Sequence, residues 1–371
     1  MAEKIEHWLA LNMIPGVGAS RCQKLLKHFG SPQAILGADL KELQHVSGIG
    51  EYTARQIVKF RDELDIEIEK EISKIEKQKV SIVTFSDDNY PSNLKSIFDP
   101  PIVLYVKGKL LPEDRIAIAM VGTRRPTAYG KMVAEKLSKE LAEREVSVVS
   151  GLARGIDTSA HKGALSCGGR TIAVLGCGVD ICYPRENRAI FDEIVKSGAV
   201  VSEFPMGTPP ERINFPLRNR IISGLSLGAV IVEAGSRSGA LITADCALEQ
   251  GREVFAVPGN IFNLGTKGTH SLIKQGAKLV ERCEDIIEEI RCLRDVLPVC
   301  PAIRSVGEVK LSQEEERVYN LLSFEPIHID LISKESGLPI NRISSVLMNL
   351  EMKGKIRQVA GKMFLRVPET Q

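Results

Sequence analysis

Several carboxylates and one histidine have positions in the sequence that would suit acid–base chemistry. A hydrolase or transferase needs a positioned nucleophile or acid–base pair. Asp157 and His161 are four residues apart, which places them on one face of the first turn of a helix and would suit a catalytic or metal-binding pair. The structural interpretation is favoured, because an Asp at a helix start caps free N–H groups and a His one turn later can bond to it. The other candidates are Asp180, Glu203 and Glu233, and no metal-ligand spacing occurs elsewhere.

Arginines recur where the predicted strands end, and a guanidinium group is suited to binding anions. Such recurrence along one edge, without an organised catalytic set, favours a repeated anion, namely a polynucleotide backbone. Phe215 and Tyr183 could stack bases beside it. The arginines are Arg124, Arg125, Arg154, Arg185, Arg218, Arg220 and Arg237.

Glycine-rich loops supply further anion donors. The loop 122–130 follows the apolar run 116–121, and the loop 151–157 follows the apolar run 146–150. Each loop leads into a predicted helix, whose N-terminus offers free N–H groups and the positive end of the helix dipole. A third loop has the composition of a phosphate cradle, with two glycines, two hydroxyls and one guanidinium. Its residues are Gly235, Ser236, Arg237, Ser238 and Gly239.

The glycine spacing does not match the standard nucleotide-binding loops. From Gly122, the first, third and sixth positions of the dinucleotide fingerprint hold Gly, Arg and Thr, and the run from Gly176 fails at Ile181. The phosphate loop of nucleoside triphosphatases is also absent, because Gly130-Lys131 is followed by methionine. We therefore expect no nucleotide cofactor and no metal ion.

Strand, loop and helix patterns alternate through the middle of the chain. The continuous apolarity of 171–176 indicates a buried parallel strand, and further strands are predicted at 81–85, 99–105, 200–205, 229–233 and 253–258. The last of these should close the sheet, and a helix should start after Pro216. The alternation predicts an α/β fold with a mostly parallel sheet. The loops would then lie at its carboxyl edge, where such folds bind ligands.

The chain of 371 residues is long enough for two or three domains. Residues 1–64 look helical and repeat an apolar-x-Gly-x-Gly turn at 14–18 and 46–50, which resembles the helix-hairpin-helix motif. Arg21, Lys24 and Arg55 would then face phosphate, but tight turns in a helical bundle are an equal alternative. A charged connecting helix is expected over 62–79, and the α/β domain is assigned to residues 65–300.

Residues 301–371 have the pattern of a winged helix. Helices are predicted at 314–322, 330–336 and 341–353, the first with a capping box from Ser312 to Glu315, and a β-hairpin at 356–359 and 363–367. The helix 341–353 offers Arg342, Asn349 and Lys353, which is only a modest positive charge. Protein contact or dimerisation is therefore as good an interpretation of this domain as DNA binding.

Composition limits the class of protein. The net charge of +2 provides no global argument for nucleic acid, so any such argument depends on local basic patches. Eight cysteines without a Cys-x-x-Cys pair are typical of free thiols in a reducing compartment. With no signal pattern and no apolar run of membrane-spanning length, we expect a cytoplasmic protein.

The sequence resembles the DNA-processing protein A (DprA/Smf) family. The resemblance is carried by residues 121–126, 150–161, 175–184, 202–205, 215–223, 235–243 and 255–259, and it covers most of 85–285. It implies an extended Rossmann-like core without a nucleotide cofactor, flanked in longer members by a helical (helix-hairpin-helix or SAM-like) domain and a winged helix. It also implies single-stranded-DNA binding, loading of the RecA recombinase onto incoming strands during natural transformation, and homodimerisation through the Rossmann-like domain.

Motif and resemblance together predict a non-enzymatic DNA-binding site, with Asp157 and His161 as structural residues at a helix start. Family phosphate-contact positions match at Gly122, Thr123, Arg124, Arg218, Asn219, Arg220 and 235–239. The full predicted DNA-binding set is Gly122, Thr123, Arg124, Arg125, Arg154, Arg185, Phe215, Arg218, Asn219, Arg220, Gly235, Ser236, Arg237, Ser238 and Gly239.

Two other functions are compatible with parts of the sequence. A nucleoside-monophosphate phosphoribohydrolase would share the Rossmann-like scaffold and a Gly-rich, Thr-containing loop followed by a Glu on the helix. After Thr243, however, the chain has Ala244, Asp245 and Cys246, with Glu249 a further turn on, so the expected carboxylate is displaced. A winged-helix regulator of transcription that binds duplex DNA is the other alternative.

Overall fold

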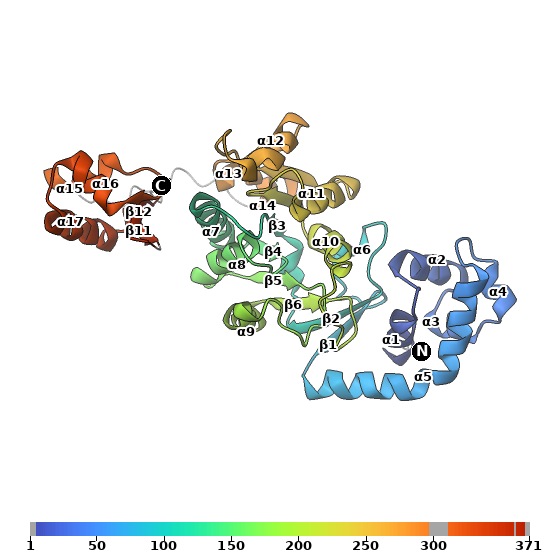
Figure 1. Ribbon diagram of the computed structural model, residues 1–371. Coiled ribbons are helices and arrows are strands. Elements are labelled where there is room, and N and C mark those ends of the chain that lie inside the picture. The colour runs from blue at the N-terminus through green and yellow to red at the C-terminus, as the bar shows by residue number, and fades with distance from the viewer. Residues whose placement is uncertain (1–4, 297–310, 360, 368–371) are drawn as a thin grey trace. The chain divides into compact units, whose positions relative to one another are not determined.

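The computed structural model describes residues 5–296, 311–359 and 361–367 (Figure 1). The chain separates into two compact units. The larger unit contains the N-terminal helices and the α/β sheet, and the smaller contains the C-terminal domain together with residues 126–133. The predicted boundary at 300/301 lies outside the described residues. No described helix combines the length and the apolar character needed to cross a membrane.

The N-terminal part is helical, as predicted. Its helices are α1 (Ile5–Met13), α2 (Ala19–Phe29), α3 (Pro32–Gly37), α4 (Leu40–Gln44) and α5 (Glu51–Lys77). Gly16 and Gly48 have φ angles of +80° and +89°, a conformation that favours glycine, so both apolar-x-Gly-x-Gly segments are tight turns before a helix. Helix α5 runs without interruption through the predicted domain boundary at 64/65. The last helix of the second hairpin and the charged connecting segment are therefore one continuous helix.

A sheet of nine strands forms the centre of the larger unit. The strand order is β1-β2-β6-β5-β4-β3-β7-β8-β9. Only the β1–β2 and β2–β6 pairs are antiparallel, so the prediction of a mostly parallel sheet is confirmed. The strands are β1 (Ser81–Thr84), β2 (Val103–Gly108), β3 (Ala117–Val121), β4 (Ser147–Ser150), β5 (Thr171–Val174), β6 (Ala199–Ser202), β7 (Gly228–Ile231), β8 (Glu253–Ala256) and β9 (Lys278–Leu279).

Two details of the predicted sheet domain are wrong. The segment 253–258 does not close the sheet, because β9 pairs beside β8. Strand β9 has two exposed residues and therefore no apolar pattern to reveal it. Helix α10 (Asn214–Gly224) begins before Pro216 rather than after it, which is tolerated because the N–H groups of the first helical turn have no partner within the helix.

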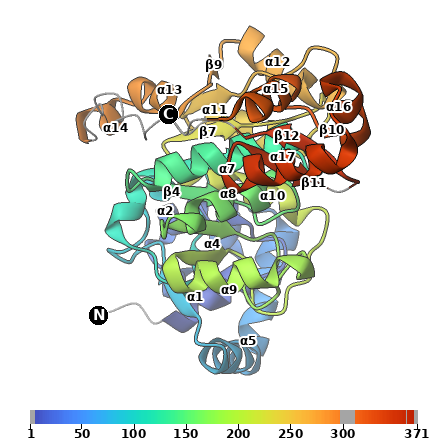
Figure 2. The same ribbon diagram turned by 90° about the vertical axis from the view of Figure 1, so that its left-hand side faces the viewer.

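Helices lie on both faces of the sheet (Figures 1 and 2). Ile172 and Val174 of β5 pack in one apolar cluster with α10, whereas Ala173 between them packs in the opposite cluster with α9 (Arg188–Ser197). This alternation follows from the two-residue period of a strand. The remaining helices of the domain are α6 (Ser92–Lys95), α7 (Ala128–Ala142), α8 (Ile156–Ser166), α11 (Gly239–Glu249), α12 (Lys267–Lys274), α13 (Cys283–Glu289) and α14 (Arg291–Val296).

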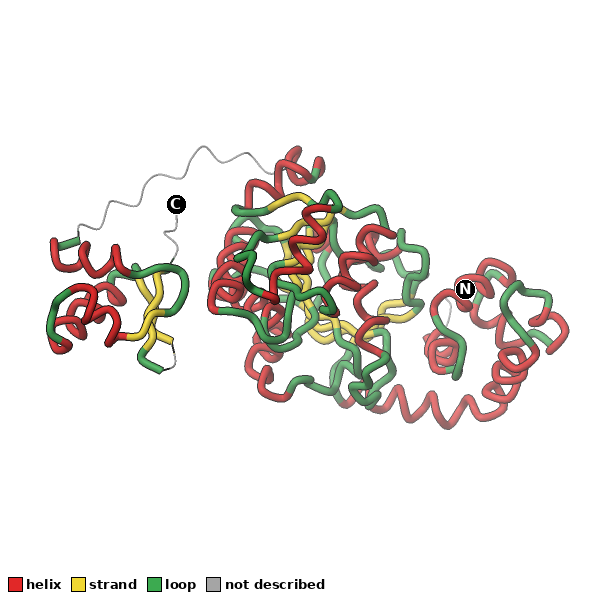
Figure 3. The backbone as a smooth tube through the Cα atoms, turned by 45° about the horizontal axis from the view of Figure 1, so that its top comes forward, coloured by secondary structure: helices red, strands yellow, loops and turns green. Residues whose placement is uncertain are grey.

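The C-terminal domain is a winged helix, as predicted (Figure 3). Its helices surround a separate apolar core that includes Val318, Ile332 and Leu347. The predicted capping box is present: Ser312 accepts from the N–H of Glu315, and the Glu315 carboxylate accepts from the N–H of Ser312 at 2.7 Å. The elements are α15 (Gln313–Leu321), β10 (Ile327–His328), α16 (Ile329–Ser336), α17 (Ile340–Met352), β11 (Ile356–Val359) and β12 (Met363–Arg366).

Candidate nucleic-acid interface

The predicted loops meet at the carboxyl edge of the sheet. Strand β3 pairs in parallel with both β4 and β7, so the loops that follow these strands leave the same edge. Two backbone hydrogen bonds join the loops: the N–H of Thr123 donates to the carbonyl of Glu233 at 2.7 Å, and the N–H of Ile156 donates to the carbonyl of Thr123 at 3.2 Å. The prediction that separate segments of sequence converge on one edge is confirmed.

Gly122 and Thr123 serve the packing of these loops. A Cβ atom at Gly122 would lie 2.6 Å from the side chain of Ile156, so only glycine lets the start of α8 come this close. The N–H of Thr123 is occupied by Glu233, and its hydroxyl accepts from the N–H of Arg125 at 3.2 Å. The amide of Thr123 is therefore not free to donate to a phosphate in this conformation, and the contact of Thr123 with DNA stays a prediction.

A guanidinium and two aromatic rings form one surface at this edge. The guanidinium carbon of Arg124 lies 5.2 Å from the centre of the Phe215 ring, and the Tyr183 ring lies 5.7 Å from the Phe215 ring, tilted by 36°. A Cβ at Gly176 would be 3.0 Å from the Phe215 ring, so Phe215 packs directly on that glycine. Such a surface can hold a phosphate at Arg124 and stack a base on an aromatic face.

Four of the seven predicted arginines are exposed and have no ion pair among the residues that the structure describes. They follow three different strands and thus extend the positive charge along the edge. A guanidinium group that is not neutralised by a carboxylate can bind a phosphate oxygen through two parallel hydrogen bonds. These arginines are Arg124, Arg125, Arg185 and Arg237.

Two further arginines are neutralised by carboxylates. Arg154 is exposed but forms a two-point ion pair with Glu186, one arm of which is 2.7 Å long. Arg220 lies between Glu203 and Asp99, with 3.3 Å from its Nε to the Asp99 carboxylate, and its side chain is largely buried. In this conformation Arg220 is held by carboxylates, so its contact with phosphate stays a prediction, and Arg154 would first have to leave Glu186.

Arg218 and Asn219 lie beneath the loops, not on the surface. Arg218 is 4% exposed, and its Nη1 donates to the carbonyl of Val174 and, at 2.7 Å, to that of Gly151. Burial lowers the pKa of its guanidinium to about 10, while nearby Asp157 opposes the shift. The Asn219 amide donates to the carbonyl of Gly239 at 3.3 Å. In this conformation both residues fix the positions of loops, and their contact with DNA stays a prediction.

Asp157 and His161 are buried structural residues, but not in the predicted arrangement. The Asp157 carboxylate accepts from the N–H groups of Gly151 and Ala153, which belong to the preceding loop. His161 bonds through Nδ1 to the hydroxyl of Thr171 at 2.7 Å and not to Asp157. Burial raises the pKa of Asp157 and lowers that of His161 to about 3, so the imidazole is neutral.

The third predicted loop has the features of an anion cradle. The Ser238 hydroxyl caps α11 by accepting from the N–H of Ala240, and the N–H of Ser238 donates to the carbonyl of Gly235 at 3.0 Å. Ser236 and Arg237 between them are exposed. Nothing lies within 4 Å of the Cβ position at Gly239, so the space above the helix start is open to a ligand.

A neighbouring apolar loop was not predicted from the sequence. Residues Ile261, Phe262 and Leu264 are 64%, 87% and 78% exposed between β8 and α12. The N–H of Gly268 donates to the carbonyl of Ala234 at 2.7 Å, which ties this segment to the 235–239 loop. Three large apolar residues between a strand and a helix were the available signal, because such residues are usually buried.

The remaining acid–base candidates have structural partners. Asp180 accepts from the N–H of Gly207 at 2.9 Å, and Glu203 holds Arg220. Glu233 is 3% exposed. Within the described residues, no group of three or more His, Cys, Asp or Glu side chains is placed to hold a metal ion.

The terminal domains expose less positive charge than their sequences suggest. In the helical domain, Arg21 donates to the carbonyl of Gly16, and Arg55 pairs with Glu51. In the winged helix, Arg342 pairs with Glu314 at 3.1 Å, and Lys353 pairs with Glu315 at 2.7 Å. Lys24 is thus the one predicted phosphate-facing residue of the hairpins that has no ion pair or hydrogen bond among the described residues.

Comparison with known proteins agrees with this architecture. Residues 81–291 match the family described as DNA recombination-mediator protein A, residues 306–362 match the DprA winged helix domain, and residues 9–62 match the SAM-like helix-hairpin-helix tandem. Protein Smf of Escherichia coli is 39% identical over 312 residues, which is 83% of each chain. DNA processing protein DprA of Bacillus subtilis is 49% identical over 215 residues, which is 57% of this chain and 72% of that protein.

Two solved structures are also similar. DNA processing protein A of Streptococcus pneumoniae superposes with a TM-score of 0.69 at 36% identity, over 78% of this chain and 99% of that one. DNA processing protein A of Helicobacter pylori, described with a unique single-stranded-DNA binding mode, superposes with a TM-score of 0.53 at 30% identity, over 58% of this chain and 97% of that one. The family match spans more than half of the chain, and the folded core carries its motifs on one sheet edge. The chain belongs to the DNA recombination-mediator protein A (DprA/Smf) family.

Proposed function

We propose that this protein binds single-stranded DNA along the carboxyl edge of its sheet. The observation that carries the proposal is the set of four exposed arginines without carboxylate partners among the described residues, placed beside the aromatic surface of Phe215 and Tyr183. Arginines hold the phosphates through charge-assisted hydrogen bonds, and the rings stack bases regardless of sequence. The Helicobacter pylori relative, whose structure is described with a single-stranded-DNA binding mode, supports this choice of ligand.

The proposal extends to the biological role. By its family, the protein acts in the cytoplasm as a homodimer, protects incoming single strands during natural transformation and loads RecA onto them. It does this by binding alone, without making or breaking covalent bonds. Membership of the DNA recombination-mediator family supports this role, and the contacts of Asp157, Glu203 and Asp180 within the fold agree with a site that works by holding a strand.

The decisive experiment is a titration of the full chain with single-stranded and duplex oligonucleotides of equal length at two salt concentrations. We expect tighter binding of the single strand, with an affinity that falls steeply as salt rises, because bound phosphates release counterions. Preference for a defined duplex would support the regulator instead. Robust release of bases from nucleoside monophosphates would support the phosphoribohydrolase.

RecA loading needs its own test. A single strand pre-coated with single-strand-binding protein is mixed with RecA, and filament growth is followed with and without this protein. We expect growth to accelerate when the protein is present. No acceleration, with single-strand binding intact, would remove the loading role and leave the binding role.

A further inference from the structure

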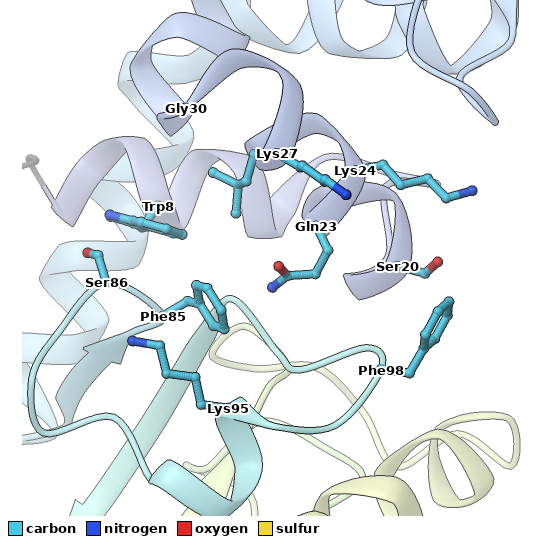
Figure 4. Close-up of a pocket in the computed structure, with 11 residues that line it drawn as sticks. Trp8, Ser20, Gln23, Lys24, Lys27, Gly30, Phe85, Ser86, Lys95 and Phe98 are labelled. Carbon is cyan, nitrogen blue, oxygen red and sulfur yellow. The ribbon is translucent and has the colours of Figure 1, made fainter. Parts of the chain in front are cut away.

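A second basic crevice lies between the helical domain and the sheet, away from the arginine loops. It has a volume of about 700 Å³ (Figure 4). Helix α2 forms one wall with Lys24 and Lys27, and the segment between β1 and β2 forms the other with Phe85, Lys95 and Phe98. In Figure 4 the side chain of Gln23 extends from α2 toward this opposite wall.

The crevice has an excess of positive charge. Among the residues that the structure describes, its lining includes three lysines and no carboxylate. None of these lysines forms an ion pair with another residue in the described part of the chain, although Lys95 lies 5.1 Å from the centre of the Phe85 ring. Like charges held near one another repel, so a bound anion would relieve the repulsion. The crevice is therefore suited to a negatively charged ligand.

The same crevice also presents an exposed aromatic ring. Phe98 is 86% exposed, although large apolar side chains are usually buried. A planar ring in the same crevice as three ammonium groups fits a ligand that carries both phosphates and flat bases. A polynucleotide strand has this chemistry, and base stacking on an aromatic side chain is tolerant of sequence.

The sheet topology places the crevice on the same edge as the arginine loops. Thr84 at the end of β1 pairs with Val103 at the start of β2, and Tyr105 of β2 pairs with Ser202 at the end of β6. Because β2 runs opposite to β6, the segment between β1 and β2 leaves the sheet at the carboxyl edge. Four strand-to-strand steps separate β2 from β3, which corresponds to roughly 19 Å.

We propose that the crevice is a second binding site for the same single strand. Lys24 and Lys27 hold its phosphates, and a base stacks on Phe98. Even at the duplex spacing of about 3.4 Å per nucleotide, roughly six nucleotides span the distance from Arg124, so a strand of about 20 nucleotides is long enough to reach both sites. This inference rests on the proposed function, because the strand reaches the crevice from the arginine loops.

The test compares two lengths of oligothymidylate, about 3 and about 20 nucleotides, on full-length protein. For the Lys24→Ala/Lys27→Ala variant we expect the salt slope of log affinity to fall by about 1.4 with the long strand and to stay unchanged with the short strand. For Phe98→Ala we expect a loss of about tenfold with the long strand only. All substituted side chains are exposed, so the variants should unfold at the wild-type temperature.

A matched control separates the crevice from general charge. Lys41→Ala/Lys59→Ala removes the same charge from exposed positions of the helical domain that do not line the crevice, and it should leave both slopes unchanged. Trp8 is the single tryptophan and lines the crevice, so its fluorescence should change with the long strand and not with the short one.

The outcomes are distinct for the two proposals. Long-strand affinity and slope at wild-type values in the crevice variants would overturn the second site and leave the proposed function intact. Wild-type protein that binds neither strand would overturn the proposed function itself. A loss confined to duplex DNA would overturn the assignment of the crevice to a single strand.

Discussion

Arginines of similar appearance in the sequence differ in the carboxylates around them. Arg124 and Arg188 each lie over a phenylalanine ring, at 5.2 Å and 5.4 Å from its centre. Arg188 also donates to Asp192 at 3.0 Å, whereas Arg124 has no such partner among the described residues. The proposed binding of single-stranded DNA should therefore depend on Arg124 and not on Arg188.

Replacing Arg124 with alanine should weaken single-strand binding with little dependence on sequence. The salt slope of log affinity should fall by about 0.7, because one phosphate contact is lost. The measurement is a titration with oligothymidylate at several salt concentrations. Arg188→Ala is the control of equal charge and should leave the slope at its wild-type value. An unchanged slope in Arg124→Ala would mean that Arg124 does not contact a phosphate.

His161 should make the stability of the protein depend on pH. Burial lowers its pKa to about 3, so the folded protein resists a proton that the unfolded chain accepts near the ordinary value of 6.5. The stability contributed by neutral His161 is thus complete above pH 6.5 and is lost as the pH falls toward 3, by at most about 1.4 kcal/mol per pH unit.

The measurement is the free energy of unfolding of wild type and His161→Gln across that range. The variant is expected to start less stable, because the bond to Thr171 is altered, but to lose less stability on acidification. Parallel curves for the two proteins would show that His161 does not titrate in this way.

At the scale of elements, α10 links the loops of the site through a buried guanidinium. Arg218 on this helix holds the carbonyls of Gly151 and Val174, which follow or end two different strands. A Cβ at Gly151 would meet the Arg218 guanidinium at about 2.4 Å, so glycine is needed to admit this group. Helix α10 carries Phe215 itself and sets the position of the loop after β4, which bonds through Ile156 to Thr123 beside Arg124.

Replacing Arg218 with methionine should destabilise the fold by about 3–5 kcal/mol, because the buried Asp157 carboxylate loses a nearby positive charge and two buried carbonyls lose their donor. The free energy of unfolding in denaturant measures this effect. Arg218→Lys should be intermediate, since one ammonium cannot reproduce the fork of the guanidinium. A methionine variant of wild-type stability that binds DNA poorly would show that Arg218 acts on the strand directly.

Helix α17 of the winged helix has an unusual surface for a DNA-reading helix. Arg342 and Lys353 are held by glutamates, whereas Ile340, Met348 and Met352 are 50%, 64% and 79% exposed. The three apolar residues recur at multiples of four positions and so follow one side of the helix. This pattern favours protein contact over duplex recognition among the two interpretations that the sequence leaves open.

At the scale of the whole molecule, the winged helix and the core should be separable. The winged helix has its own apolar core, and the four exposed arginines without carboxylate partners among the described residues belong to the larger unit. Deleting residues 301–371 should leave most single-strand affinity and the unfolding temperature of the core intact. Calorimetry and an oligonucleotide titration of the truncated chain measure both quantities. Complete loss of affinity would relocate the site to the C-terminal domain.

Much of the architecture could be predicted because it depends on patterns of residues that are close together in the sequence. The continuous apolarity of 171–176, the glycine turns at Gly16 and Gly48, and the capping box at Ser312 each specify an element without help from distant residues. Strand β9 could not be predicted, since its two exposed residues pair only because β8 is there. The start of α10 was misplaced because Pro216 is tolerated within a first turn as well as before it.

The candidate site was predictable in its location but not in the role of each arginine. Arg154, Arg218 and Arg220 follow strands as Arg124 does, and nothing in their spacing separates them. The arginines differ in their partners in the fold. Arg154 pairs with Glu186, Arg218 donates to buried carbonyls, and Arg220 pairs with Glu203 and Asp99. These partners are 17 to 121 residues away along the chain. Sequence therefore identified the arginines, and long-range contacts decided which of them are neutralised.

The alternation of strand, glycine loop and helix was specified by the sequence alone, because hydrophobic period and backbone freedom are properties of neighbouring residues. The same alternation was enough to place the loops at one edge of a parallel sheet. Only the folded chain shows which charges remain exposed at that edge. The second basic crevice beside α2 is likewise a feature of the folded chain alone. The physical reason is that burial and ion pairing depend on which distant side chains the fold brings within a few ångströms. The spacing of neighbouring residues does not indicate which side chains these are.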